Sequence, residues 1–127
     1  MTGRPQNDAP QPAHWEAAFD PPHLGMPFAP TASARVVDHL GDFVEIFLCV
    51  KDLRIVDAGF LTSLPGAGMA AASAWCAGAI GKSLDDAAHL DPSTPPHAKG
   101  GRRAARLATR AGRAALAKAQ RTAGGRR

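Results

Sequence analysis

The sequence predicts an α+β fold, in which a small antiparallel three-stranded sheet has helices packed on one face and is followed by a basic C-terminal helix. Three observations lead to this prediction. Apolar residues alternate through 43–50 and 54–62, as they do in half-buried strands. A run of small residues over 67–80 has helical apolar spacing. The stretch 102–120 is rich in alanine, leucine and arginine, which favour helix.

The sheet is predicted from these two longer strands, with a short first strand at 34–37. A turn at 51–53 joins the longer strands as an antiparallel hairpin. In the first long strand, the alternation predicts Val44, Ile46, Leu48 and Val50 on one face and Phe43, Glu45, Phe47 and Cys49 on the other. In the second, it predicts Val56, Ala58 and Phe60 on one side and Ile55, Asp57 and Leu61 on the other.

Two helices are predicted after the sheet, which ends at 63–66. The helix over 67–80 carries small side chains that allow close packing on a sheet, and its apolar stripe is Met69, Ala72, Cys76 and Ile80. Ser83, with Asp86 three residues later, predicts a capped second helix that runs to about Leu90. The proline-rich stretch 91–96 is predicted to be a linker.

The chain of 127 residues is predicted to contain one domain. We expect a flexible proline-rich segment at 1–33, a domain at 34–121 that includes the basic helix at about 100–121, and a frayed tail at 122–127. No apolar run is long enough to cross a bilayer, and the first residues lack the apolar core of a signal peptide. The two cysteines make no disulfide framework, and we expect a cytoplasmic location.

Charge is divided very unevenly along the chain. Residues 1–98 contain five Lys/Arg and all eleven acids, for a net charge of −6, whereas residues 99–127 contain ten Lys/Arg and no acid, for +10. A basic stretch of this kind can contact nucleic acid or anionic surfaces. It contains no aromatic residue on which bases could stack. The alternative interpretation is a solvated basic helix that packs through Leu107.

Several short motifs occur in one order along the chain. They are Asp20-Pro21-Pro22-His23-Leu24-Gly25, Leu40-Gly41-Asp42, the strand from Ile55 to Thr62, the run from Gly66 through Ser73, and Gly81-Lys82-Ser83-Leu84. Together they resemble the motifs of NifU/IscU-type iron–sulfur cluster assembly scaffolds. The resemblance begins at about residue 20 and continues nearly without gaps.

The resemblance also implies where ligands would lie. Scaffolds of this family hold a nascent cluster with three thiolates and a nearby carboxylate, and soft thiolates are what such clusters require. The three cysteine positions correspond here to Leu40, Pro65 and a residue within 101–104, taken as Ala104. The carboxylate corresponds to Asp42. The resemblance therefore implies binding of iron or an iron–sulfur cluster that is weakened or lost in this chain.

Several further residues have side chains of the kinds that bind metals or act as nucleophiles. His39 and Asp42 are the predicted metal ligands, with His97 as a further group if the linker folds back; the alternative for His39 is a solvated loop histidine. Cys49 and Cys76 are predicted to be packed or partly buried thiols. Ser73 has no evident partner base, so no enzyme activity is predicted. The Gly-rich stretch before the helix at 67–80 lacks phosphate-loop spacing.

Two functions are consistent with these features. The first is a scaffold-like role in iron–sulfur cluster assembly, for which the resemblance implies a cysteine desulfurase or other cluster-assembly proteins as partners. The alternative is a non-catalytic interaction module whose basic tail contacts a partner protein or nucleic acid. No membrane association is predicted.

Overall fold

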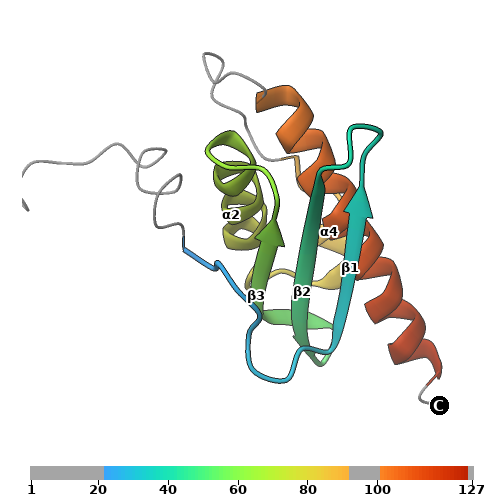
Figure 1. The fold of residues 1–127 in the computed structure, drawn as a ribbon. Coiled ribbons are helices and arrows are strands. Elements are labelled where there is room, and N and C mark those ends of the chain that lie inside the picture. Colours follow the sequence, from blue (N-terminus) through green and yellow to red (C-terminus); the bar gives the residue numbers. More distant parts are fainter. Residues whose placement is uncertain (1–21, 92–100, 126–127) are drawn as a thin grey trace, which may run out of the picture.

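The computed structural model describes residues 22–91 and 101–125. They form the strands β1 (Ala32–Val37), β2 (Phe43–Lys51) and β3 (Arg54–Thr62) and the helices α2 (Ala67–Ala79), α3 (Leu84–Ala87) and α4 (Gly101–Gly125). The strands pair antiparallel in the order β1-β2-β3. Both longer helices lie behind the sheet in Figure 1, α4 against β1 and β2 and α2 against β3. The predicted α+β fold is confirmed.

The hairpin between β2 and β3 contains a β-bulge that the sequence pattern did not reveal. Val50 pairs with Ile55 whereas Cys49 pairs with Asp57, so Val56 is an extra residue on β3. A bulge reverses the facing of the residues beyond it. Ile55 is fully buried and Val56 is 55% exposed. The predicted faces of these two residues were therefore wrong, because strict alternation assumes an uninterrupted strand.

The core lies between the sheet and the two longer helices. Its largest buried side chain is Trp75 on α2, which was absent from the predicted apolar stripe. Of that stripe, Ala72 and Cys76 are fully buried and the other two members are half-buried. A Cβ atom added at Gly112 of α4 would lie 2.3 Å from the Trp75 ring. The absence of a side chain at Gly112 thus gives the indole its space.

Helix α4 belongs to the core and extends beyond the predicted range of 102–120. Alanine and leucine form its buried face, which consists of Ala104, Leu107, Ala108, Ala111, Ala115, Leu116 and Ala119. Small side chains allow the helix to lie close to its neighbours, and its arginines point away from this face or lie at its edge. The basic residues of α4 that the structure describes therefore lie on the outer surface of a core helix or at the edge of its buried face.

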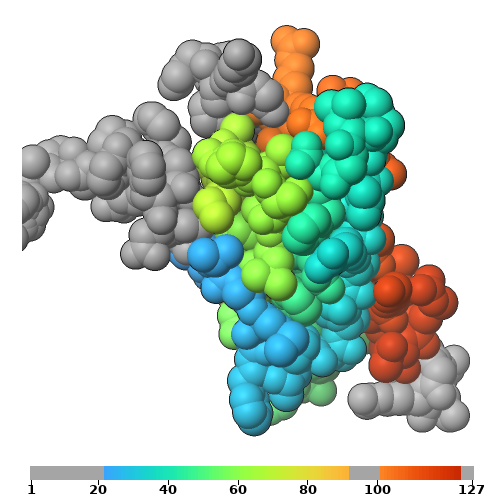
Figure 2. Space-filling model, in the orientation of Figure 1, coloured from blue at the N-terminus to red at the C-terminus, as the bar shows by residue number. Residues whose placement is uncertain are grey.

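The segment before β1 is attached to the sheet. The Gly25 amide donates to the Phe60 carbonyl oxygen at 2.7 Å, and the Phe60 amide donates to the His23 carbonyl oxygen at 3.0 Å. In Figure 2 this segment lies against β3 at the lower left of the sheet. Of the predicted flexible segment 1–33, residues 1–21 lie outside the described residues. The rest is held by hydrogen bonds, and β1 begins at Ala32.

The short helix α3 begins as the sequence predicts and ends earlier. Ser83 is its N-cap, with its Oγ accepting from the Asp86 amide at 3.1 Å. The helix ends at Ala87, and a turn carries the chain to Leu90. The predicted linker 91–96 lies almost wholly outside the described residues. No helix in the described part of the chain is long and apolar enough to cross a membrane.

Candidate functional site

The loop between β1 and β2 is folded around the carboxylate of Asp38. Its Oδ1 accepts from the amides of Leu40 at 3.0 Å and Asp42 at 3.1 Å. The Asp38 amide donates in turn to the Asp42 carbonyl oxygen at 2.8 Å. Gly41 has φ +88°, a left-handed conformation that glycine adopts without strain. These contacts fix Leu40 and Asp42 on a tight, ordered turn.

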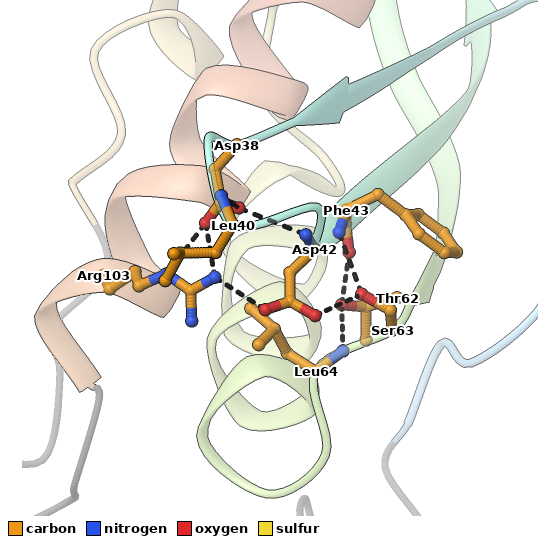
Figure 3. Close-up of polar contacts among 8 residues, drawn as sticks. All are labelled: Asp38, Leu40, Asp42, Phe43, Thr62, Ser63, Leu64 and Arg103. Carbon is orange, nitrogen blue, oxygen red and sulfur yellow. Dashed lines mark hydrogen bonds and ion pairs between the residues drawn. The ribbon is translucent and has the colours of Figure 1, made fainter.

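Arg103 of α4 reaches into this loop and contacts two carboxylates (Figure 3). Its Nε donates to Asp38 Oδ2 at 2.8 Å, and its Nη2 lies 2.6 Å from Oδ2 of both Asp38 and Asp42. The side chain of Asp38 is only 10% exposed, whereas those of Asp42 and Arg103 are about one-third exposed. Charge-assisted contacts of this kind are stronger than neutral ones, so they bind α4 to the loop.

A third segment, between β3 and α2, joins the same cluster. Ser63 Oγ donates to Asp42 Oδ1 at 3.1 Å and accepts from the Phe43 amide at 2.9 Å. Thr62 Oγ1 donates to the Phe43 carbonyl oxygen at 2.7 Å and accepts from the Leu64 amide at 3.1 Å (Figure 3). The site therefore gathers the β1–β2 loop, the β3–α2 connection and the start of α4.

Solved structures of other proteins share the fold that carries this site. The N-terminal part of a nitrogen-fixing NifU-like protein from Brucella abortus is 18% identical with a TM-score of 0.64, covering 87% of this chain and 94% of its own. A putative iron–sulfur cluster assembly scaffold for the SUF system from Fervidobacterium islandicum is 13% identical with a TM-score of 0.65, covering 84% and 96%. The chain has the NifU-like scaffold fold. No family model and no curated protein matches it.

A further solved structure, of a hypothetical protein, is similar in the same way. It is 19% identical with a TM-score of 0.65, and the alignment covers 82% of this chain and 93% of the other. At these identities the likeness concerns the fold. The chemistry of the site therefore depends on the residues that occupy it in this chain.

In this NifU-like fold, the three positions identified from the resemblance carry no thiol and differ in their surroundings. Leu40 is 64% exposed on the loop. Pro65 is exposed two residues after Ser63, the residue bonded to Asp42. Ala104 is 2% exposed and belongs to the core, whereas the neighbouring Arg103 reaches the loop. Of the residues 101–104, Arg103 is the one whose side chain lies at Asp42.

The donor set does not suit an iron–sulfur cluster. Leu40 and Pro65 carry no ligand atom, and Arg103 is a cation with donors only. Asp42 offers hard oxygens, which already accept from Arg103 and Ser63. Such clusters are held by soft thiolates. Within residues 22–91 and 101–125, no group of three or more His, Cys, Asp or Glu residues could hold a metal ion.

The two predicted metal ligands, Asp42 and His39, have different surroundings. Asp42 faces Arg103 and Ser63, while His39 is exposed on the loop and lines a groove beside α4. A cation at Asp42 would compete with the guanidinium for the same oxygen. Metal binding by these two residues stays a prediction, and His97 lies outside the described residues.

The two cysteines lie away from this site and are both free. Cys76 is fully buried on α2, and burial raises the pKa of its thiol to about 12. Cys49 is half-buried, and burial together with the charge of Asp57 raises its pKa. A thiol with a raised pKa is a poor nucleophile and ligand. Ser73 is buried and donates to the Pro22 carbonyl oxygen at 2.8 Å, which gives it a structural role.

Arg103 and Asp38 are the site residues that sequence reasoning missed. They are separated by 65 residues in the chain, and a charge at either position is unremarkable by itself. The one available signal was an arginine in the stretch where the resembled family has its third cysteine. Arg102 and Arg103 both satisfy that signal, and only the helix geometry distinguishes them.

The ion pair predicts a pH-dependent stability. Burial alone would raise the pKa of Asp38, but hydrogen bonds from the Leu40 amide and Arg103 outweigh it, so the pKa lies below the usual 3.8. A lowered pKa means that the charged group stabilises the folded state above pH 3.8, and that this stability is lost as the pH falls through the folded-state pKa. Asp38→Asn is expected to lower the melting temperature at neutral pH.

Melting temperatures measured from neutral pH down to about pH 3 test this expectation. The difference in melting temperature between wild type and Asp38→Asn should narrow as the pH falls below 3.8 toward the folded-state pKa of Asp38, because a growing fraction of the Asp38 carboxyl is then protonated. The exposed Asp91 provides the control, and Asp91→Asn should follow wild type throughout. A gap of constant size at every pH would show that the Asp38 charge does not matter.

Proposed function

We propose that this protein takes part in iron–sulfur cluster assembly as a non-enzymatic interaction protein that has the scaffold fold but does not itself carry the cluster. The proposal combines the NifU-like fold with the chemistry of the site. The observation on which it depends is Arg103, whose Nη2 lies 2.6 Å from Asp42 Oδ2. The resemblance implies that scaffolds of this family hold their cluster beside the carboxylate that corresponds to Asp42, and here a fixed cation contacts that carboxylate.

Electrostatics supports the proposal that the protein does not carry a cluster at Asp42. Iron ions bound near Asp42 would meet the positive guanidinium at close range, and like charges within a few ångströms repel strongly away from bulk water. Displacing Arg103 would also leave the largely buried Asp38 carboxylate without its cationic partner. Loss of thiolates and gain of a cation both disfavour a cluster at this position.

Anaerobic reconstitution tests the absence of a cluster. After incubation with ferrous iron and sulfide followed by desalting, wild type is expected to retain neither iron nor the visible absorbance of a cluster. Asp42→Ala is expected to behave identically, since Asp42 is already paired with Arg103. A cysteine-containing scaffold of the same fold, treated in parallel, controls for the chemistry. Iron retained by wild type and lost from Asp42→Ala would instead support the metal pair of Asp42 and His39.

Partner binding tests the interaction role. The partner class proposed from the resemblance is a cysteine desulfurase or another cluster-assembly protein, in the cytoplasm. Co-elution of the purified full chain with such a protein in size-exclusion chromatography is expected. Failure to bind any component of the assembly machinery would contradict this role, and it would leave the reconstitution result intact.

The basic surface offers a second candidate function, binding of an anionic partner. Truncation before α4 cannot test it, because α4 supplies core residues such as Leu107 and Leu116. Substitution of outward arginines by glutamine removes charge and leaves the core unchanged. If desulfurase binding survives these substitutions, the basic face is not the contact used for assembly.

A further inference from the structure

A groove lies beside the candidate site, between the β1–β2 loop and the outer face of α4. It has a volume of about 380 Å³. Its lining consists of Asp38, His39, Arg103, Arg106, Leu107 and Arg110. Volumes in this range are typical of small-molecule sites. The groove therefore combines a concave shape with an unusual concentration of arginine.

Among the described residues, the positive charge in the groove exceeds the negative charge. Asp38 is the one acid among the described lining residues, and it is paired with Arg103. In the described part of the chain, neither Arg106 nor Arg110 has a carboxylate within 4.0 Å. These two residues are four apart on one helix, and like charges at this spacing repel each other. An anion bound between them would relieve that repulsion.

We propose that this groove binds a small phosphate-bearing molecule, with Arg106 and Arg110 donating to its phosphate oxygens. Guanidinium groups present paired donors that match phosphate geometry. Leu107 supplies an apolar wall, and the groove is larger than a single phosphate needs. The ligand class is therefore a phosphate ester or a diphosphate rather than free phosphate alone. This proposal does not depend on whether the protein carries a cluster.

The shape and lining favour a small molecule over a macromolecule. None of the described residues that line the groove is aromatic, so they offer no ring on which a nucleic-acid base could stack. A protein partner generally needs a much broader contact, of about 800 Å² on each side. Arg106 and Arg110 line one concave groove, and Arg103 beside them is held by Asp38. This places two neighbouring guanidinium groups at one small site.

Isothermal titration calorimetry with pyrophosphate, on the full chain, tests the proposal. Wild type is expected to bind, and Arg106→Gln and Arg110→Gln are each expected to weaken binding about tenfold, since each removes charge-assisted hydrogen bonds. Arg121→Gln is the matched control: Arg121 is exposed on the same helix, outside the groove lining, and its substitution removes the same charge. It should leave binding unchanged.

Further measurements distinguish binding of a phosphate-bearing molecule from misfolding, from general electrostatic attraction and from binding of other anions. Unchanged melting temperatures of the variants would exclude misfolding as the cause of weaker binding. No heat of binding for wild type at millimolar pyrophosphate would overturn the proposal. If Arg121→Gln weakened pyrophosphate binding as much as Arg106→Gln and Arg110→Gln do, the binding would be due to the general charge of α4, and the proposed site would be wrong. Tighter binding of citrate, or binding of a single-stranded oligonucleotide without binding of pyrophosphate, would refute the assigned ligand class.

Discussion

Gly112→Ala is expected to lower the free energy of unfolding by about 2 kcal/mol or more. The added Cβ would lie 2.3 Å from two carbon atoms of the Trp75 ring, far inside van der Waals contact. Alanine has a higher helix propensity than glycine by about 1 kcal/mol. That gain in helix propensity is smaller than the cost of the clash, because Trp75 is 1% exposed and buried side chains in close-packed cores move only at a cost.

A second glycine on a helix provides the matched control. A Cβ added at Gly78 of α2 would lie 3.4 Å from Leu90 Cδ2, at the edge of ordinary contact with a flexible side chain. Gly78→Ala is therefore expected to leave stability unchanged or to raise it by up to about 1 kcal/mol. Urea unfolding followed by circular dichroism measures both variants. If both changed stability in the same direction, contact with Trp75 would not be the deciding factor.

Gly59→Ala is expected to detach the segment before β1 from the sheet. The added Cβ would lie 2.1 Å from the Gly25 carbonyl oxygen, and a backbone atom cannot turn aside as a side chain can. The two hydrogen bonds between Phe60 and this segment would break. We expect a loss of about 2 kcal/mol in the free energy of unfolding. Faster hydrogen exchange of the Phe60 amide would mark the detachment.

Ser73→Ala, a milder change at a contact of the same segment, provides a comparison for the loss of stability in Gly59→Ala. Ser73→Ala removes only the hydrogen bond to the Pro22 carbonyl oxygen, at a cost of about 1 kcal/mol. In Ser73→Ala the Phe60 amide should stay protected from hydrogen exchange, because the close contact between Gly59 and the segment remains. Equal exchange rates in Gly59→Ala and wild type would mean that the segment does not depend on the close approach at Gly59.

Much of the fold could be predicted from local pattern. The bounds of β3, the start of β2 and the cap at Ser83 follow from alternation, turn residues and capping chemistry, all of which act between near neighbours. The turn between β2 and β3 places Asp52 and Leu53 at positive φ, as a tight hairpin turn requires. Such features depend on a few consecutive residues, so the sequence reveals them.

Packing partners could not be predicted in this way. The bulge that buries Ile55 and exposes Val56 depends on how two strands meet. The burial of Trp75 depends on a glycine 37 residues later, on another helix. Neither has a periodic signature. The apolar stripe on α2 identified Cys76 correctly and missed Trp75, because this helix is covered on more than one side.

The sequence by itself determined the fold class. It also showed that the positions corresponding to the family's cysteine ligands carry no thiol, and that Asp42 corresponds to the family's carboxylate. Only the tertiary structure decided what Asp42 contacts. Arg103 lies 61 residues away in the chain and pairs with it across the junction of a loop and a helix. Electrostatic pairing acts through space and leaves no spacing rule in the sequence. The fold therefore decides that the carboxylate of Asp42, which could otherwise bind a metal, forms an ion pair with the guanidinium of Arg103.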